Sequence, residues 1–276
     1  MICFPNAKIN LGLHVVSRRP DGYHDLETIF YPIGLKDALE IIPTSETRFF
    51  QTGNPIEGPS DNNLVIKALR MITAERKLPE MDIHLLKKIP SGAGLGGGSS
   101  DAAFMLNLLN DTFKLEYTRE ELMMRAARLG ADCPFFIINK PAYATGIGDK
   151  LEPIEVDLSR YTLLLVKPDV RISTKEAYAM ITPHKPELSL KEIITQSPET
   201  WRDLMKNDFE LPVFKKFPEI CKIRQQLYEM GAIYASMSGS GSALFGLFEK
   251  YETILFFNYY RIIDSNKPEG SATINA

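Results

Sequence analysis

The chain has 276 residues, a formal net charge of −3, 44% hydrophobic residues and 24% charged residues. This is the composition of a globular protein, and it excludes wholesale disorder because enough apolar surface is available to offset chain entropy. It shows no basic excess for nucleic acid binding, and no apolar run reaches the roughly 20 residues that a membrane-spanning helix needs.

The cysteines and histidines are spaced too widely in the sequence to form a known motif. Cys3, Cys133 and Cys221 are widely separated and form no C-x-x-C pair, and the four histidines are equally dispersed. The sequence therefore predicts neither a disulfide framework nor a structural metal site. The N-terminal residues do not follow the pattern of a signal peptide, so we expect a cytoplasmic protein. We also expect a monomer or a weak homodimer.

In chain order, apolar periodicity and turn residues predict an alternation of strands and helices. Strands are predicted over Lys8–Ser17, Leu26–Leu35, Ala38–Ile42 and Met81–Ile89, with a helix over Asn63–Lys77. Further helices are predicted over Ser100–Asn110, from Thr118 to Gly130, from Ser173 and over Pro218–Met230, with strands over Tyr161–Val166 and Ser242–Glu249. The segment Tyr251–Ile263 fits either a helix or a strand. The irregular order indicates an α+β protein, and we expect two domains, residues 1–152 and 153–276.

The most informative segment is rich in glycine. Five glycines fall within seven residues: Gly92, Gly94, Gly96, Gly97 and Gly98. They are followed by Ser99 and Ser100 and then by an apolar helix. Backbone N–H groups in such a loop, placed at the positive end of a helix, form an anion site, and a polyphosphate is its natural occupant. A flexible linker is the alternative, but apolar elements on both sides disfavour it.

The familiar nucleotide-binding motifs do not fit this loop. A P-loop needs a lysine after its last glycine, but Gly97 is followed by Gly98 and the loop has no lysine. The dinucleotide pattern matches in its glycines only, and the protein-kinase segments H-R-D and D-F-G are absent. A second cluster, Ser236–Ser242, contains Gly239 and Ser240. It is either a simple turn or a second wall of the same anion site, and the second reading predicts phosphoryl transfer from a nucleoside triphosphate with Mg²⁺.

These two clusters, together with Ala7–Leu11, resemble the three motifs of the galactose, homoserine, mevalonate and phosphomevalonate (GHMP) kinase superfamily. Pro5–Val15, Arg18–Leu26, Gly96–Ala103 and Leu129–Phe136 are similar to the branch whose substrate is a cytidine diphosphate sugar alcohol. The resemblance implies an N-terminal ribosomal-protein-S5-like lobe that binds ATP, a C-terminal ferredoxin-like lobe and an active site in the cleft between them. It implies that ATP phosphorylates the tertiary 2-hydroxyl of a methylerythritol unit in the non-mevalonate isoprenoid pathway.

By resemblance, the catalytic residues are Asp132 and Lys8. A carboxylate within reach of the attacking hydroxyl can take its proton or orient it, and a neighbouring ammonium keeps that carboxylate ionised. Without the resemblance, Asp132 would be an ordinary loop residue and Lys8 a solvent-exposed one. Asn10, two residues further along the strand, shares the face of Lys8 and is expected to bind the substrate.

The remaining site residues also follow from the resemblance. Substrate binding is assigned to Asn10, Tyr23, His24, Asp132, Ile147, Thr174 and Tyr178. The two residues after the Asp-Gly turn, Tyr23 and His24, are expected to hold the cytosine, with Tyr178 on the other face of the base. ATP binding is assigned to Asn63, Gly92, Gly94, Gly96, Gly97, Gly98, Ser99, Ser100, Gly239 and Ser240. Without the resemblance, Asn63 would simply cap its helix.

The predicted cofactor is ATP with Mg²⁺. The sequence offers no carboxylate that clearly belongs to a metal site, so we expect phosphates and water, with a serine hydroxyl as a further candidate, to hold the ion. Two other functions stay open at this point. One is a superfamily kinase of the homoserine or mevalonate type, which the Tyr23–His24 pair disfavours. The other is a non-catalytic ATP-binding sensor, which the presence of both Lys8 and Asp132 disfavours.

Overall fold

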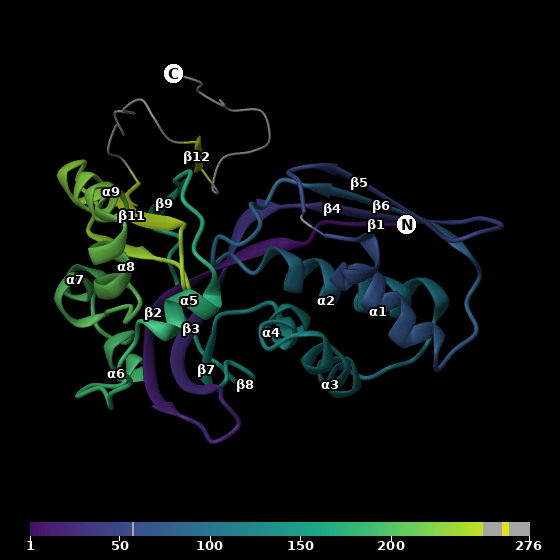
Figure 1. Cartoon of the computed structure of the whole chain (residues 1–276), viewed down its shortest axis with the longest axis horizontal. Helices are drawn as coiled ribbons and strands as arrows, with labels where there is room; N and C mark the ends of the chain where they lie inside the picture. The colour runs from purple at the N-terminus through teal and green to yellow at the C-terminus, as the bar shows by residue number, and fades with distance from the viewer. Residues whose placement is uncertain (57, 251–260, 265–276) are drawn as a thin grey trace. The chain divides into compact units, whose positions relative to one another are not determined.

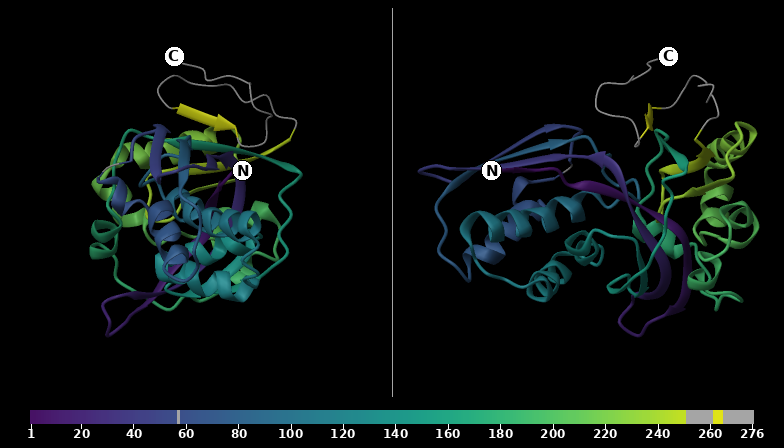
Figure 2. Two further views of the ribbon diagram at one scale, coloured as in Figure 1. Left: turned by 90° about the vertical axis from the view of Figure 1, so that its right-hand side faces the viewer. Right: turned by 180° about the vertical axis from the view of Figure 1, so that it is seen from behind.

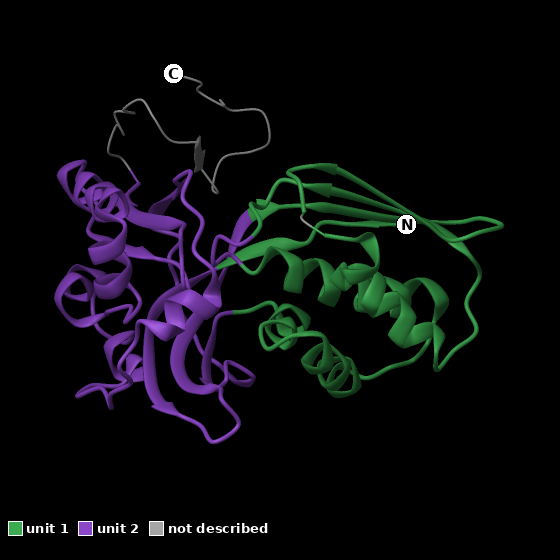
Figure 3. Ribbon diagram, in the orientation of Figure 1, with its two compact units in different colours: residues 1–8, 35–91, 96–140 green, residues 9–34, 92–95, 141–276 purple. Residues whose placement is uncertain are grey.

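The computed structural model describes residues 1–56, 58–250 and 261–264. Two compact units can be distinguished (Figure 3). Unit 1 contains residues 1–8, 35–91 and 96–140, and unit 2 contains residues 9–34, 92–95 and the chain from 141 onward. Both units are therefore discontinuous in the chain. The two expected domains, residues 1–152 and 153–276, are each one continuous segment of the chain. That domain boundary stays a prediction.

Unit 1 contains a four-stranded sheet with helices packed against it. The sheet has the order β1 (Ile2–Cys3), β4 (Ala38–Pro43), β6 (Met81–Lys87) and β5 (Arg48–Gly53). Strands β5 and β6 are parallel, and the other neighbours are antiparallel. The helical segments of this unit are η1 (Ser60–Asn62), α1 (Leu64–Thr73), α2 (Gly97–Phe113), α3 (Arg119–Leu129) and α4 (Cys133–Ile138).

Alternation along the strands of unit 1 creates its core. Leu39 pairs with Leu85 and Ile41 with Ile83, so that all four side chains fall on one face of the sheet. Helices α1 and α2 cover this face (Figure 1), and the view from behind shows the same arrangement (Figure 2). Helix α2 is apolar nearly all round and has eight buried residues, as its sequence predicts.

The start of helix α3 confirms a local prediction. Thr118 accepts a hydrogen bond from the backbone N–H of Glu121, and the Glu121 carboxylate accepts one from the backbone N–H of Thr118, which completes a capping box. Replacing Thr118 by alanine should lower the free energy of unfolding by about 1 kcal/mol, because the backbone N–H of Glu121 loses its side-chain acceptor. Urea unfolding measures the change. The neighbouring exposed variant Glu120→Ala should shift it by less than about 0.5 kcal/mol, and equal effects would contradict the capping role.

Unit 2 contains two further four-stranded sheets. One has the order β2 (Asn6–Arg18), β3 (His24–Lys36), β7 (Ala142–Gly146) and β8 (Lys150–Pro153), and the first three residues of β2 belong to unit 1. The other has the order β10 (Tyr234–Met237), β11 (Leu244–Glu249), β9 (Tyr161–Lys167) and β12 (Arg261–Asp264). The helical segments are α5 (Thr174–Ala179), α6 (Leu190–Ile193), η2 (Pro198–Thr200), α7 (Trp201–Leu204), α8 (Glu210–Lys216) and α9 (Pro218–Glu229).

The core of unit 2 lies between its second sheet and helices α8 and α9. Val213 of α8 and Ile220, Ile223 and Leu227 of α9 pack against Leu164, Val166, Leu244 and Phe248 of the sheet. Mostly antiparallel sheets and helices that do not alternate regularly with strands make the protein α+β, as expected.

Several predicted boundaries are wrong by a few residues. Helix α2 begins at Gly97, three residues before the predicted start, because two glycines and Ser99 form its first turn. Helix α1 ends at Thr73 instead of Lys77, and β6 ends at Lys87. Strand β5, helix α4 and the short helices between residues 190 and 216 were not expected from the sequence. In the segment Tyr251–Ile263, for which the sequence allows both a helix and a strand, residues 251–260 lie outside the described residues, and Arg261–Asp264 form strand β12. Within the described ranges, no helix has the length and apolar character required to span a bilayer.

Candidate active site

The Lys8 and Asp132 side chains meet in unit 1. Lys8 lies on strand β2, and Asp132 is the residue that precedes helix α4. The Lys8 Nζ atom is 3.6 Å from Asp132 Oδ2, and the side chains are 4% and 34% exposed, respectively. The pair therefore has a buried cation and a carboxylate that solvent, or a substrate hydroxyl, can reach. The spatial pairing that the resemblance implied is present.

Burial dominates the electrostatics of Lys8. Removal from water lowers the pKa of the Lys8 ammonium, and the negative charge of Asp132 opposes that change. The stem of Lys8 also lies against the glycine-rich segment, because its Cε atom is 3.2 Å from the position that a Cβ on Gly96 would take. The ion pair is thus adjacent to the start of helix α2. A carboxylate and an ammonium lie beside the positive end of a helix.

The glycine-rich segment uses conformations that only glycine adopts easily. Gly96 is the N-cap of α2 with φ of +70°, and a side chain there would meet Phe136 and Lys8. Gly94 has φ of +78°, and an added Cβ would collide with the carbonyl oxygen of Ser238. Gly92, Gly94 and Gly96 thus precede the helix, and Gly97, Gly98, Ser99 and Ser100 form its first turn. The N–H groups of Gly97, Gly98 and Ser99 have no acceptor within the helix, whereas that of Ser100 donates to the carbonyl of Gly96 over 2.9 Å. The first three donors of the helix therefore favour an anion.

The second glycine-serine cluster packs on the first within unit 2. The Ser238 hydroxyl donates to the carbonyl of Gly94 over 2.8 Å and lies 3.4 Å from Asn10 Oδ1. Asn10 also donates to Thr28 Oγ1 over 2.9 Å and is 1% exposed. Asn10 therefore connects the strand that carries Lys8 to the second glycine cluster, and Ser238 connects that cluster to Gly94. Ser238 and Thr28 were missed by the sequence reasoning, although Ser238 lies inside the second cluster.

A buried asparagine holds the second cluster in place. Asn207 is 3% exposed, and its amide donates to the carbonyls of Met237 and Gly239 over 2.8 and 2.9 Å. Its side-chain oxygen accepts from the N–H of Phe209. No sequence signal pointed to Asn207, because a single asparagine before a short helix is common. Gly239 itself is buried, and Ser240 is half-buried with its hydroxyl 3.3 Å from Thr174 Oγ1.

Asn63 and Ile147, two further predicted contact residues, already have local partners. Asn63 is the N-cap of α1, and its side-chain oxygen accepts from the N–H of Val65 over 2.9 Å. Asn63 therefore caps its helix, as expected without the resemblance, and its contact with adenine remains a prediction. The backbone N–H of Ile147 donates to Asp149 Oδ1 over 3.1 Å, and the substrate contact of Ile147 remains a prediction.

The predicted base-binding residues come together in unit 2, with one difference from expectation. The rings of His24 and Tyr178 are stacked, with centroids 4.9 Å apart and planes 19° from parallel. Phe209 contacts the Tyr178 ring edge-on at the same centroid distance. Tyr23 is 61% exposed. A cytosine held between His24 and Tyr178 would need a gap between the two rings, but here His24 lies directly on one face of Tyr178. Of the three rings predicted to bind the base, that of Tyr23 is open to solvent.

The oxygen atoms near the glycine-rich segment suit a hard cation bound through phosphates. Ser100 Oγ is buried and has no hydrogen-bond partner in the described part of the chain, which leaves an oxygen available to a phosphate or to Mg²⁺. No group of three or more histidine, cysteine or acidic side chains in the described residues could form a metal site of its own. A Mg²⁺ ion bound together with ATP needs few protein ligands, because the triphosphate and water supply most of its oxygen ligands.

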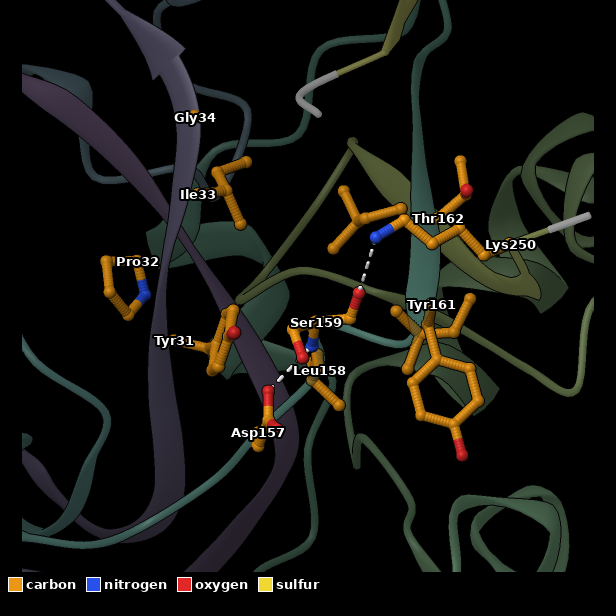
Figure 4. A pocket seen from close by; sticks show the side chains of 12 residues that line it. Tyr31, Pro32, Ile33, Gly34, Asp157, Leu158, Ser159, Tyr161, Thr162 and Lys250 are labelled. Atoms are coloured by element: carbon orange, nitrogen blue, oxygen red, sulfur yellow. Dashed lines mark hydrogen bonds between the residues drawn. The ribbon is translucent and has the colours of Figure 1, made fainter. Parts of the chain in front are cut away.

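A separate cavity of about 370 Å³ lies elsewhere in unit 2 (Figure 4). Its polar side chains include Tyr31, Asp157, Ser159 and Lys250. The backbone N–H of Ser159 donates to Asp157, and the Lys250 ammonium donates to the carbonyl of Ser159 over 3.2 Å. None of the predicted site residues lines this cavity.

Comparison with known proteins places the fold and the glycine clusters in a defined class. The family model described as the GHMP kinases N terminal domain matches residues 63–140, and the GHMP kinases C terminal model matches residues 189–255. A mevalonate kinase from Methanococcus jannaschii is 17% identical, with a TM-score of 0.66 and 91% of each chain covered. At that identity the likeness concerns the fold alone. The fold is that of the GHMP kinases.

Closer relatives narrow the class. The chain is 59% identical over 250 residues to a 4-diphosphocytidyl-2-C-methyl-D-erythritol kinase of Parabacteroides distasonis, covering 91% of this chain and 92% of the relative. It is 55% identical over 258 residues to the same kinase of Bacteroides fragilis, with 92% and 94% covered. A crystal structure of 4-(cytidine 5'-diphospho)-2C-methyl-D-erythritol kinase is 35% identical, with a TM-score of 0.78 and 90% of each chain covered. The chain therefore belongs to the 4-diphosphocytidyl-2-C-methyl-D-erythritol kinase family of GHMP kinases.

Proposed function

We propose that this small-molecule kinase transfers the γ-phosphoryl group of ATP to the 2-hydroxyl of 4-(cytidine 5'-diphospho)-2-C-methyl-D-erythritol, in the non-mevalonate isoprenoid pathway. The observation that carries the proposal is the ion pair of Lys8 and Asp132 next to Gly96, the N-cap of helix α2. It puts a proton acceptor, a cation and an anion-binding helix end within one small region of unit 1. A relative named for this substrate is 59% identical and covers 91% of the chain, which supports the choice of substrate.

In the proposed reaction, the hydroxyl oxygen of the substrate attacks the γ-phosphorus. A new O–P bond forms as the bond from the γ-phosphorus to the bridging oxygen of ADP breaks, and the hydroxyl proton passes to the Asp132 carboxylate or is oriented by it. The Lys8 ammonium stabilises the ionised carboxylate. The N–H groups around Gly96 and in the first turn of α2 bind the phosphates. Mg²⁺, held mainly by phosphates and water with Ser99 or Ser100, would neutralise charge on the transferred group.

The base is proposed to bind at His24 and the aromatic residues Tyr23 and Tyr178, with Asn10 and Thr174 as polar contacts to the substrate. A cytoplasmic location, which the three free cysteines suit, and a monomer or weak homodimer are parts of the same proposal. A superfamily kinase of another specificity would not need the Tyr23–His24 pair after the Asp-Gly turn. A non-catalytic sensor would not need a lysine and a carboxylate paired at the helix end.

The test is an assay of ADP release from Mg-ATP with the purified protein. The alcohols are the cytidylylated methylerythritol, homoserine and mevalonate, and one sample has no alcohol. Release that depends on the cytidylylated compound supports the proposal. Release with homoserine or mevalonate instead, or release that needs no alcohol, contradicts it. The assay without added Mg²⁺ and with EDTA should show no turnover if the ion is required.

His24→Ala is expected to raise the KM for the cytidylylated substrate about five- to a hundredfold, because one aromatic–base stacking contact contributes roughly 1–3 kcal/mol. The KM for ATP should stay near that of the unaltered protein. Steady-state kinetics with each substrate varied in turn measures both. His84→Ala is the matched control, because His84 stacks on Phe50 in unit 1 with centroids 4.8 Å apart. Equal damage to the KM for ATP would remove His24 from the base-binding role.

A further inference from the structure

A buried charge cluster lies at both ends of the glycine-rich segment. Its members are Asp37, Lys87 and Asp101, whose side chains are at most 2% exposed. The Lys87 ammonium donates to the carboxylate of Asp37, and also to that of Asp101 over 2.6 Å. All three residues belong to unit 1. Charged side chains are rarely buried this completely unless they are paired, as these three are.

Each member is attached to a different element of the chain. Asp37 lies between strands β3 and β4, Lys87 is the last residue of β6, and Asp101 is the fifth residue of helix α2. The glycine-rich segment runs from just after β6 to the start of α2. Lys87 therefore precedes it and Asp101 follows it. The contact between these two side chains closes the loop at its base.

Asp37 holds the strand that leads into the loop. Its Oδ1 atom accepts hydrogen bonds from the backbone N–H groups of Lys88 and Ile89, over 2.5 and 2.8 Å. These are the two residues directly after β6. Lys87 in turn lies against the first turn of α2, because its Nζ is 3.2 Å from the position that a Cβ on Gly97 would take.

The charge balance of the cluster indicates what stabilises it. Two carboxylates face one ammonium, and burial raises the pKa of Asp101 while the charge of Lys87 opposes that change. The two N–H groups that donate to Asp37 and the positive end of helix α2 near Asp101 compensate for the excess negative charge. Asp101 Oδ1 has no hydrogen-bond partner among the described residues. Apolar side chains could fill this space without such compensation, so stability alone does not account for the ionic link.

We propose that Asp37, Lys87 and Asp101 are positioning residues that clamp the two ends of the glycine-rich loop and so preorganise it for the triphosphate. The inference rests on the proposed function, because it takes ATP as the ligand of that loop. The three side chains are too buried to act by exposed contact and act through the backbone that they hold. A loop with five glycines in seven residues has many conformations available, and fixing its ends limits the entropy lost when the phosphates bind.

The test removes the ion pair between Lys87 and Asp101. The contacts of Asp37 with Lys87 and with the backbone after β6 are left in place. Asp101→Ala removes the acceptor of Lys87 on α2, whereas Asp101→Asn keeps an oxygen in the same place and should rescue the function. Leu106→Ala is the matched control, because Leu106 is a buried residue of the same helix and belongs to the apolar core of unit 1. Thermal unfolding establishes that each variant is folded.

The first measurement is ATP binding by titration calorimetry, without any alcohol substrate. We expect Asp101→Ala to raise the Kd for ATP about tenfold or more, and Asp101→Asn to stay within about threefold of the unaltered protein. The second measurement is hydrogen exchange of residues 91–100 in the ligand-free protein. Exchange there should quicken in Asp101→Ala more than in Leu106→Ala. In kinetics, the KM for ATP should rise in Asp101→Ala while the KM for the alcohol changes little.

The outcomes separate the clamp from the function on which it rests. If the unaltered protein binds ATP and Asp101→Ala binds it equally well, the clamp is wrong and the proposed function stands. If Leu106→Ala loses as much ATP affinity as Asp101→Ala, the effect is one of general stability and the positioning role is likewise overturned. If the unaltered protein does not bind ATP, the proposed function fails and the inference fails with it.

Discussion

Asp132→Asn is expected to lower kcat about a hundredfold or more while the KM for ATP stays within about threefold, because positioned proton transfer contributes typically 10²–10⁴-fold to a rate. Asparagine has the shape of aspartate but cannot accept the hydroxyl proton. It also removes the negative charge that faces the Lys8 ammonium at 3.6 Å. Because burial already lowers the pKa of Lys8, loss of that charge lowers it further.

Steady-state kinetics of the cytidylylated substrate and of ATP checks this result. Asp111→Asn is the matched control, since Asp111 is an exposed acid near the end of helix α2 in the same unit, and it should keep full activity. Lys8→Met adds a second arm. If the two residues act as one unit, the double variant should lose about as much as the more damaging single variant. A turnover unchanged in Asp132→Asn would remove this carboxylate from the mechanism.

Gly94→Ala is expected to destabilise the protein by about 3 kcal/mol or more and to weaken ATP binding at least tenfold. The left-handed backbone at φ of +78° costs an alanine roughly 1–2 kcal/mol. Its Cβ would in addition collide with the carbonyl of Ser238, and forcing extra volume into a packed site costs typically 1–3 kcal/mol. The two glycine clusters would have to separate, and the Ser238 hydroxyl would lose the Gly94 carbonyl.

Urea unfolding and calorimetric titration with ATP measure the two effects. Gly92→Ala separates backbone strain from collision, because Gly92 has φ of +63° but nothing lies within 4 Å of the position of an added Cβ. Its loss of stability should be limited to about 1–2 kcal/mol. Equal stability losses at both positions would show that the contact between the clusters contributes little.

Local chemistry made most of the secondary structure and the nature of the ligand readable in advance. The capping box at Thr118, the apolar stripe after Asn63 and the glycine-rich segment each depend on residues a few positions apart, which interact in any context. The same locality explains the errors at element ends. Helix α2 begins at Gly97 because its start is stabilised by tertiary packing against Ile89 and Lys87, which propensity does not include.

Tertiary structure alone decided which distant residues meet. Periodicity does not predict that Asp132 pairs with Lys8, which only the family resemblance implied, and nothing in the sequence predicted that Asn10 contacts Ser238. The cluster of Asp37, Lys87 and Asp101 left no sequence signal, since a lysine at a strand end and two isolated aspartates usually face water. Burial of a charge depends on the whole surrounding fold. By itself the chain therefore determined its elements and its polyphosphate loop, whereas only the folded protein decided which side chains lie beside that loop, because long-range contacts follow from packing and not from neighbouring residues.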